Sequence, residues 1–188
     1  MIVKLLSETG YDVATKAMRL SRQSTSDTVS SEAWDIGRND YKLILKLLDS
    51  DRLESGDPHS VALRMVHLTF KITAPLYWWK QMDRYSVGKT QASESTMYTI
   101  MNRELSCEDF SYRVDSRIIE ILNDHIRANE FEYVIENLPC GYLQTRIVQF
   151  SLPTLRRILK QREGHKLAEW REFVSEVKHQ TLQEDFLK

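Results

Sequence analysis

Two stretches of the chain alternate apolar and polar residues, and several others place apolar residues every three to four positions. The stretches Met65–Ile72 and Tyr142–Phe150 both have a period of two, which predicts half-buried strands. The apolar segment Ile2–Leu6 predicts a short opening strand, followed by a turn over Ser7–Gly10. Three or four such strands among five or six helices predict an α+β fold with a central sheet of antiparallel type.

Helical spacing of apolar residues predicts the remaining elements. Asp12 is a candidate N-cap for a helix that ends near Leu20. Ser106 and Asp109 have the spacing of a loose capping box. Further helices are expected over Glu32–Leu48, Leu76–Arg84 and Ser116–Tyr133, after Pro153 as far as Arg162, and over His165–His179. Polar loops are expected over Ser21–Ser31, Asp49–Ser60 and Lys89–Ser95.

Composition narrows the class of protein. A chain of 188 residues with 41% hydrophobic and 28% charged residues fits one globular domain spanning residues 1–188. A net charge of -1 argues against a general nucleic-acid or membrane surface, and no apolar run is long enough to cross a bilayer. Cys107 and Cys140 predict neither a disulfide framework nor a zinc site, and the scattered histidines predict no metal site. We expect a soluble cytoplasmic protein.

Gln81 and Arg84 are the sharpest candidates for ligand binding. A glutamine amide can read the edge of a pyrimidine, and the planar fork of an arginine suits a phosphate. At a spacing of three they would share one face of a helix. The alternative is an exposed helix face, which polar pairs at this spacing often form.

Four other arginines also have two interpretations. Arg146, in the middle of a strand, is either a buried arginine with a partner or a ligand contact. Arg162 is either a ligand contact or a cation placed favourably at a helix C-terminus. Arg19 and Arg22 could meet a phosphate, but a solvated loop is the more frequent outcome.

The segment from His67 to Tyr98 also carries a family resemblance. Six of its residues fall at the spacing of a family motif without a gap: Phe70, Pro75, Lys80, Gln81, Met82 and Arg84. In this segment the chain resembles the central motif of the flavin-dependent thymidylate synthases. Tyr85 and Ser86 stand where that motif has a histidine and a second arginine, so they bring no positive charge to a flavin. The C-terminal third is similar to the family in its Thr145-Arg146 pair, in Arg162 and in the run Ala168–Trp170.

The resemblance implies a homotetramer with sites between subunits that methylates dUMP with FAD, NADPH and methylene-tetrahydrofolate. It assigns the nucleotide to Gln81, Arg84, Ser95, Arg146 and Arg162, and the flavin to Arg84, Tyr85, Ser86, Lys89 and Gln91. It assigns no catalytic residue. Two alternatives stay open: another pyrimidine-modifying reaction in the same pocket, and a relative without catalysis. Trp78 and Trp79 are interpreted as core or subunit-interface residues, although they could stack on a flavin ring or a base.

Overall fold

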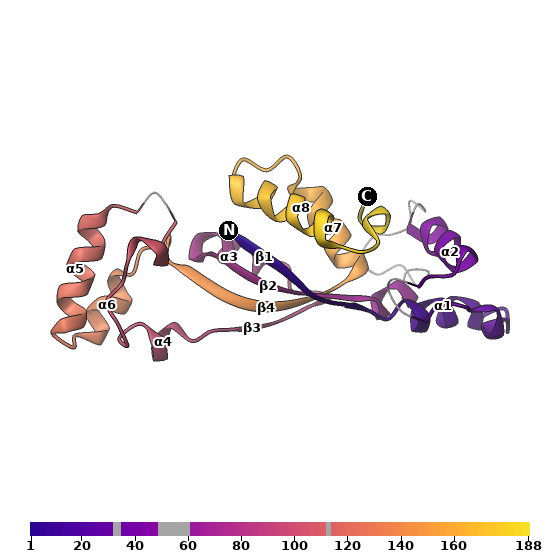
Figure 1. Ribbon diagram of the computed structural model, residues 1–188, viewed down its shortest axis with the longest axis horizontal. Helices are drawn as coiled ribbons and strands as arrows, with labels where there is room; N and C mark the ends of the chain where they lie inside the picture. The colour runs from indigo at the N-terminus through magenta and orange to yellow at the C-terminus, as the bar shows by residue number, and fades with distance from the viewer. Residues whose placement is uncertain (32–34, 49–60, 112–113) are drawn as a thin grey trace.

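The computed structural model describes residues 1–31, 35–48, 61–111 and 114–188 (Figure 1). Its strands are β1 (Ile2–Thr9), β2 (His67–Pro75), β3 (Lys89–Ser93) and β4 (Leu143–Ser151). Its helices are α1 (Tyr11–Leu20), α2 (Arg38–Leu48), α3 (Leu76–Met82), α4 (Thr96–Thr99), α5 (Ser116–Arg127), α6 (Phe131–Asn137), α7 (Leu152–Arg162) and α8 (Ala168–Gln180). Short 3-10 helices cover Thr25–Asp27, Ala62–Met65, Cys107–Asp109 and Glu184–Leu187.

The four strands form one antiparallel sheet in the order β1-β2-β4-β3. Strands β2 and β4 lie in its centre, with Leu68 opposite Phe150 and Ile72 opposite Arg146. These are the two stretches that the alternating pattern predicts as strands. The predicted α+β fold with an antiparallel sheet is therefore confirmed.

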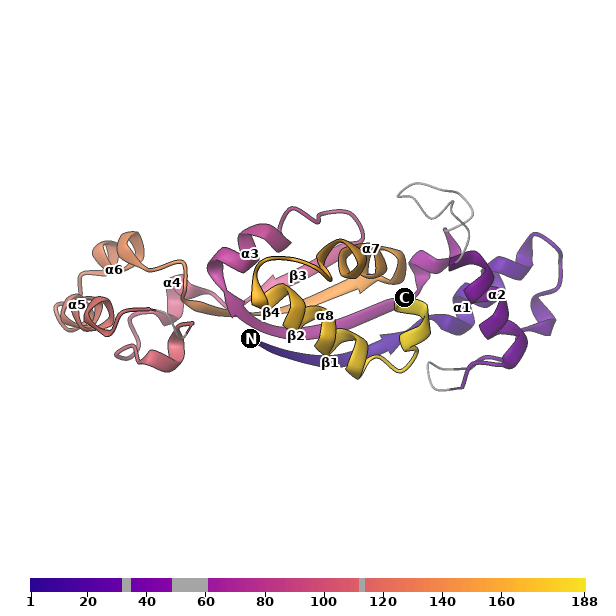
Figure 2. The same cartoon turned by 90° about the horizontal axis from the view of Figure 1, so that it is seen from above.

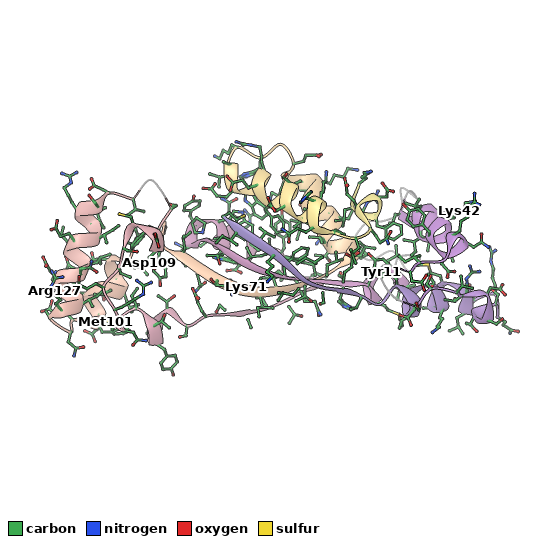
Figure 3. All side chains as sticks on the ribbon, in the orientation of Figure 1. Tyr11, Lys42, Lys71, Met101, Asp109 and Arg127 are labelled. Atoms are coloured by element: carbon green, nitrogen blue, oxygen red, sulfur yellow. The ribbon has the colours of Figure 1, made fainter. Side chains whose placement is uncertain are left out.

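One face of the sheet is covered by helices, and it holds the main core. Leu68, Phe70 and Ile72 of β2 point to this side and are fully buried. Helices α7 and α8 lie over the sheet there, and side chains fill the space between the two layers (Figures 1, 2 and 3). The opposite face has no helix of the described chain over it, and Ile2 and Ile147 are exposed on it.

The two ends of the sheet carry separate helical groups. Helices α1 and α2 lie at one end, and α4, α5 and α6 lie at the other (Figures 1 and 2). The second group has its own small core: Ile100, Leu105, Phe110, Ile119, Leu122, Val134 and Tyr142. None of the described helices is long and apolar enough to span a membrane.

The segment expected as the loop Lys89–Ser95 is instead mostly the edge strand β3. It pairs with β4, with Gln91 opposite Val148 and Ser93 opposite Arg146. Its polar composition hides the strand, because an edge strand does not need an apolar side, and polar or charged edges prevent unwanted pairing.

Several predicted boundaries also shift. Ser7–Gly10 is not a turn, because β1 continues to Thr9 and Gly10 itself precedes α1; Asp12 then lies in the first turn rather than at the N-cap. The helix expected from Glu32 begins at Arg38 among the described residues, whereas Glu32–Trp34 and the loop expected over Asp49–Ser60 lie outside them. The last long helix begins at Ala168 rather than at His165.

The helix expected over Ser116–Tyr133 is divided into α5 and α6. Asn129 has a φ of 57° and ends α5 in the left-handed conformation that asparagine tolerates. The predicted capping box is present, with Ser106 and Asp109 satisfying each other at the start of the 3-10 helix Cys107–Asp109. The sequence therefore predicts this capping box but not the interruption of the apolar stripe between α5 and α6.

Gly10 permits the direct step from β1 to α1, and its replacement tests this geometry. Its φ is 93°, and an added Cβ would lie 2.2 Å from the carbonyl oxygen of Met65. We expect Gly10→Ala to lower the free energy of unfolding by about 2 kcal/mol or more, measured by urea denaturation. Gly164→Ala is the control, because its Cβ meets nothing within 4 Å. Equal stability of the two variants would contradict this role of Gly10.

Candidate functional site

Three fully buried tryptophans join α3 to α8. Trp78 and Trp79 lie in α3 with ring centroids 4.9 Å apart, and Trp170 of α8 packs against Trp78 at 4.6 Å. Pro75 ends β2 and immediately precedes α3. Trp78 and Trp79 therefore come directly after a buried strand and lie in the same core as that strand. The interpretation of Trp78 and Trp79 as core residues agrees with this packing, which fixes the end of α3 against α8.

Trp170 orients two of the predicted ligand-binding residues. Its Nε1 donates a hydrogen bond of 2.9 Å to Oε1 of Gln81, and the guanidinium carbon of Arg162 lies 4.5 Å from the centre of its ring. The amide oxygen of Gln81 is thereby engaged, whereas its Nε2 donates to no described residue. Gln81 can therefore act toward a ligand as a donor.

Tyr85 also holds Arg162 in place. Nε of Arg162 donates to the Tyr85 hydroxyl at 2.8 Å, and that hydroxyl donates to Oε1 of Gln161 at 3.1 Å. Within the described chain, the two terminal nitrogens of Arg162 have no hydrogen-bond partner. Arg162 ends α7, as predicted. Besides its place at the helix terminus, its side chain contacts the ring and the hydroxyl group of Tyr85. A half-buried guanidinium with a free fork is suited to an acceptor group on a ligand.

Arg84 is the most accessible of the predicted residues. The structure ends α3 at Met82, so Arg84 lies in the turn after the helix, and its backbone N–H donates to the carbonyl of Gln81 at 3.3 Å. Its side chain is exposed and forms no ion pair with a described residue, and Ser86 is exposed beside it. The expectation that Gln81 and Arg84 both lie in one helix is wrong, because α3 ends at Met82.

A second polar cluster surrounds Asp83. Its Oδ1 accepts hydrogen bonds from Gln91 and Arg146, both at 2.8 Å, and lies 3.5 Å from Nζ of Lys89. Arg146 also stacks on Trp79, with its guanidinium carbon 4.3 Å from the ring centre. Of the two interpretations of Arg146, the structure supports a largely buried arginine with a partner.

Burial and charge act against each other in this cluster. Burial alone would raise the pKa of Asp83, but the hydrogen bond from Gln91 and the charges of Arg146 and Lys89 hold that pKa below its usual value. Burial lowers the pKa of Lys89, and the carboxylate of Asp83 offsets this only in part. Asp83 therefore stays ionised and is the anion on which these donors converge.

Ser95 is not brought into either cluster. It precedes α4, and its carbonyl accepts a hydrogen bond of 3.0 Å from the Thr99 hydroxyl. The described hydrogen bonds do not connect it with Gln81 or Arg84. The sequence analysis did not identify Asp83 as a site residue. It also missed the role of Trp170 in orienting Gln81 and Arg162, because a tryptophan in the apolar stripe of a helix indicates only a core residue.

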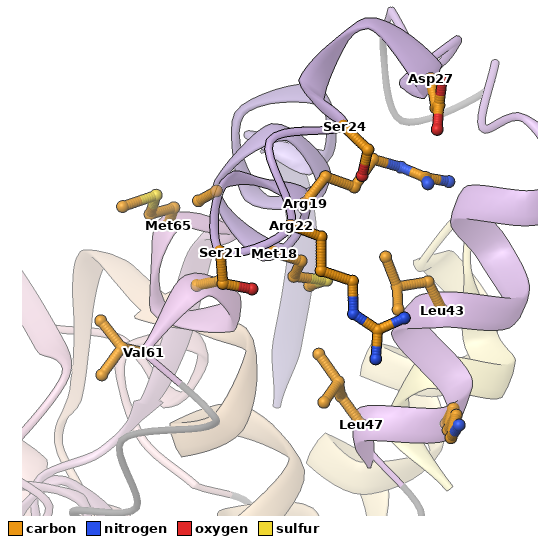
Figure 4. Close-up of a pocket in the computed structure, with 13 residues that line it drawn as sticks. Met18, Arg19, Ser21, Arg22, Ser24, Asp27, Leu43, Leu47, Val61 and Met65 are labelled. Atoms are coloured by element: carbon orange, nitrogen blue, oxygen red, sulfur yellow. The ribbon is translucent and has the colours of Figure 1, made fainter.

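A cavity of about 680 Å³ lies away from these clusters, between α1, α2 and the 3-10 helix Ala62–Met65. Its apolar lining includes Met18, Leu43, Leu47 and Met65, and its charged lining includes Arg19, Arg22, Lys46 and Asp27. The side chain of Arg22 extends from the end of α1 toward Leu43 and Leu47 of α2 (Figure 4). A volume of several hundred Å³ with apolar walls and a few charged groups is typical of a small-molecule site.

The cations of this cavity differ in their availability. Arg19 donates to the fully buried carboxylate of Asp40 with Nη2 at 2.7 Å, so its charge is neutralised. Arg22 and Lys46 are exposed and have no ion-pair partner among the described residues. Only the second of the two arginines that the sequence suggested for a phosphate is therefore free to bind one. No group of three metal-ligating side chains occurs in the part of the chain that the structure describes.

The fold is that of the flavin-dependent thymidylate synthases, as the resemblance predicts. The flavin-dependent thymidylate synthase ThyX from Helicobacter pylori, solved in complex with FAD and dUMP, superposes with a TM-score of 0.77, 20% sequence identity and full coverage of both chains. A second structure of that enzyme with FAD and dUMP gives a TM-score of 0.76 at 20% identity, over 100% of this chain and 99% of the other.

A related enzyme shares the fold as well. The UMP/dUMP methylase PolB from Streptomyces cacaoi, bound to 5-Br dUMP, has a TM-score of 0.69 and 15% identity over 95% of this chain and 88% of its own. No protein-family model matches the sequence, and no curated protein matches it either. At these identities the likeness establishes the fold, and the site must be judged from its own residues.

The buried pair Arg19–Asp40 makes a testable contribution to stability. Oδ2 of Asp40 also accepts from Ser30 Oγ at 2.7 Å, and although burial would raise the pKa of Asp40, the bonds from Arg19 and Ser30 hold it below its ordinary value. Its stabilisation is therefore present above the ordinary pKa of aspartate, about 4, and is lost as the pH falls below it.

We expect Asp40→Asn to lower the free energy of unfolding at pH 7 by about 3 kcal/mol, because it leaves a buried arginine without its counter-charge. When the pH is lowered below about 4, the free energy of unfolding should fall less for the variant than for the wild type. Urea denaturation at a series of pH values measures this difference. Asp12→Asn is the control, because it removes a more exposed ion pair, the one between Asp12 and Lys16. Parallel pH profiles for wild type and Asp40→Asn would contradict this assignment.

Proposed function

We propose that the protein binds a pyrimidine nucleotide at the end of α3 and methylates it, converting dUMP to dTMP with FAD, NADPH and methylene-tetrahydrofolate. One observation carries the proposal: Trp170 contacts both Gln81, whose Nε2 is left as a donor, and Arg162, whose terminal nitrogens have no partner among the described residues. The fold supports it, because the solved relatives with this fold include proteins in complex with dUMP and FAD.

The donors suit a uracil ring and a phosphate. Uracil presents two carbonyl acceptors, and Gln81 and Arg162 offer only donors toward a ligand, since the amide oxygen of Gln81 is engaged by Trp170. The exposed, unpaired Arg84 is free to add a charged donor to the nucleotide. The proposal assigns these residues to binding and orientation and names no catalytic residue.

The cavity between α1 and α2 suits FAD better than the residues that the resemblance assigns to it. Tyr85 is engaged by Arg162, and the donors of Lys89 and Gln91 converge on Asp83. Arg22 and Lys46, by contrast, are unpaired cations in the lining of a partly apolar cavity, a combination that fits a flavin ring and its diphosphate. Bound there, FAD would supply the reducing equivalents that a methyl transfer from a methylene donor requires.

The positions of the two regions support a shared site between subunits. The cavity at α1 and α2 and the donors after α3 lie toward different ends of the sheet (Figures 1 and 2). A flavin and a nucleotide that react with each other reach both regions only if two copies meet. The exposed Ile2 and Ile147 on the open sheet face supply apolar surface for such a contact. We therefore propose the homotetramer that the resemblance implies, in a reducing cytoplasm where the free Cys107 and Cys140 stay thiols.

A second function, a different pyrimidine modification in the same pocket, is favoured by Tyr85 and Ser86. They place no positive charge where the family has a histidine and an arginine, so a reduced flavin would be less stabilised there. The solved UMP/dUMP methylase with this fold supports the same substrate class. Failure to rescue a thymidine-requiring bacterial strain, despite flavin binding, would favour this candidate. A protein that gains no thermal stability from FAD or dUMP would instead be a relative without catalysis.

Nucleotide titration tests the proposed donors. We expect Arg84→Ala and Arg162→Met each to weaken dUMP binding about tenfold or more in isothermal titration, because each removes a charge-assisted hydrogen bond. Methionine keeps an apolar stem over Trp170, so the packing of α7 on α8 is retained. Lys160→Ala is the matched control, since Lys160 is exposed on the same helix as Arg162. Unchanged affinity in both arginine variants, or no dUMP binding by the wild type, would overturn the proposed function.

A further inference from the structure

The cluster around Asp83 has the geometry of an anion-binding site. Three donors from two strands converge on one oxygen, Oδ1: Nε2 of Gln91, Nη1 of Arg146 and Nζ of Lys89, at 2.8, 2.8 and 3.5 Å. Nζ of Lys89 also donates to the carbonyl oxygen of Met82 at 3.0 Å and to Oε1 of Gln91 at 3.2 Å, which holds the lysine in place beside Gln91. Such a convergence of charged and amide donors on one point is what a phosphate oxygen requires.

The donors are held by the sheet, whereas the anion is not. Gln91 and Lys89 lie in β3 and Arg146 lies in β4, where the antiparallel register places Gln91 opposite Val148 and Arg146 opposite Ser93. The guanidinium of Arg146 is also held against Trp79 and by its Nε, which donates to Oε1 of Gln144 at 2.9 Å. Asp83, by contrast, follows α3 in an exposed turn. Its carboxylate can move into water without disturbing an element.

The charges of the cluster do not balance. Lys89 and Arg146 have side chains 4% and 13% exposed, and their only ion-pair partner among the described residues is Asp83, which is 42% exposed. Two largely buried cations therefore share one carboxylate, which leaves a surplus positive charge. A buried charge is costly unless it is paired. A doubly charged phosphate would neutralise both cations, and Asp83 alone cannot.

We propose that Asp83 occupies an anion site in place of a ligand, and that a phosphate group displaces its carboxylate and binds Lys89, Gln91 and Arg146. This deepens the proposed function, because the phosphate would be that of the bound nucleotide. Asp83 is then a specificity-determining residue: it competes as a tethered anion with any phosphate that enters. Only a ligand that also gains contacts at Gln81, Arg84 and Arg162 binds well enough to displace it.

Replacing Asp83 with asparagine tests the displacement. If the site is open in about one tenth of the wild-type molecules or fewer, Asp83→Asn should bind inorganic phosphate about tenfold more tightly or better, in isothermal titration in phosphate-free buffer. The gain should disappear in Asp83→Asn/Lys89→Met. Glu120→Gln is the control for net charge, since Glu120 is exposed on the distant helix α5. Asp83→Ala, which offers no amide, serves as a second variant if the asparagine disturbs folding by circular dichroism.

The inference is overturned if Asp83→Asn binds phosphate no more tightly than the wild type, if Glu120→Gln gains equally, or if the gain survives removal of Lys89. Titrations with dUMP and 2′-deoxyuridine separate it from the proposed function. If Asp83→Asn gains phosphate affinity but neither protein prefers dUMP to phosphate, the proposed function fails and this inference stands. If wild type binds dUMP and Asp83→Asn changes that affinity no more than its affinity for deoxyuridine, the proposed function stands and the inference fails.

Discussion

The packing of Trp170 against α3 is the interaction on which the candidate site depends. Its buried ring lies between Trp78 and the guanidinium of Arg162, and its Nε1 engages Gln81. Without that ring the amide of Gln81 could turn either way and Arg162 would lose the surface on which it is stacked. A residue of the hydrophobic core thus determines which atoms the surface presents, since a side chain held by packing and one hydrogen bond is ready to bind at little further entropic cost.

The arginines of the site are used in two different ways. Arg84 and Arg162 keep donors free for a ligand, whereas Arg146 is paired with Asp83 inside the protein. The same contrast separates Arg22 from Arg19, whose charge is neutralised by the buried Asp40. A basic residue at a matching position is therefore not by itself a binding residue, because a carboxylate elsewhere in the fold can take up its charge. The unpaired cations can bind an anion directly, whereas a paired cation such as Arg146 can bind one only after its carboxylate partner has moved away.

The sequence predicts the fold well where burial imposes a pattern. Strands β2 and β4 are half-buried along their length, so they alternate, and the resemblance to the flavin-dependent thymidylate synthases adds the correct architecture. Strand β3 is missed because Lys89 and Gln91, which share one face of the strand, meet Asp83 instead of the core. Asp83 and Trp170 are missed as site residues for a related reason: their partners lie far away in the chain, and no spacing rule connects them. The residue assignments drawn from the resemblance remain predictions.

The central claim is that a flavin and a pyrimidine nucleotide bind this chain together. The visible absorption spectrum of the purified protein tests it most directly, recorded after incubation with FAD and passage through a desalting column, and again after dUMP is added. We expect flavin to be retained, with Arg22 and Lys46 as cations for its diphosphate, and dUMP to shift its absorption bands. A colourless protein after the column, or a flavin spectrum indifferent to dUMP, would contradict it.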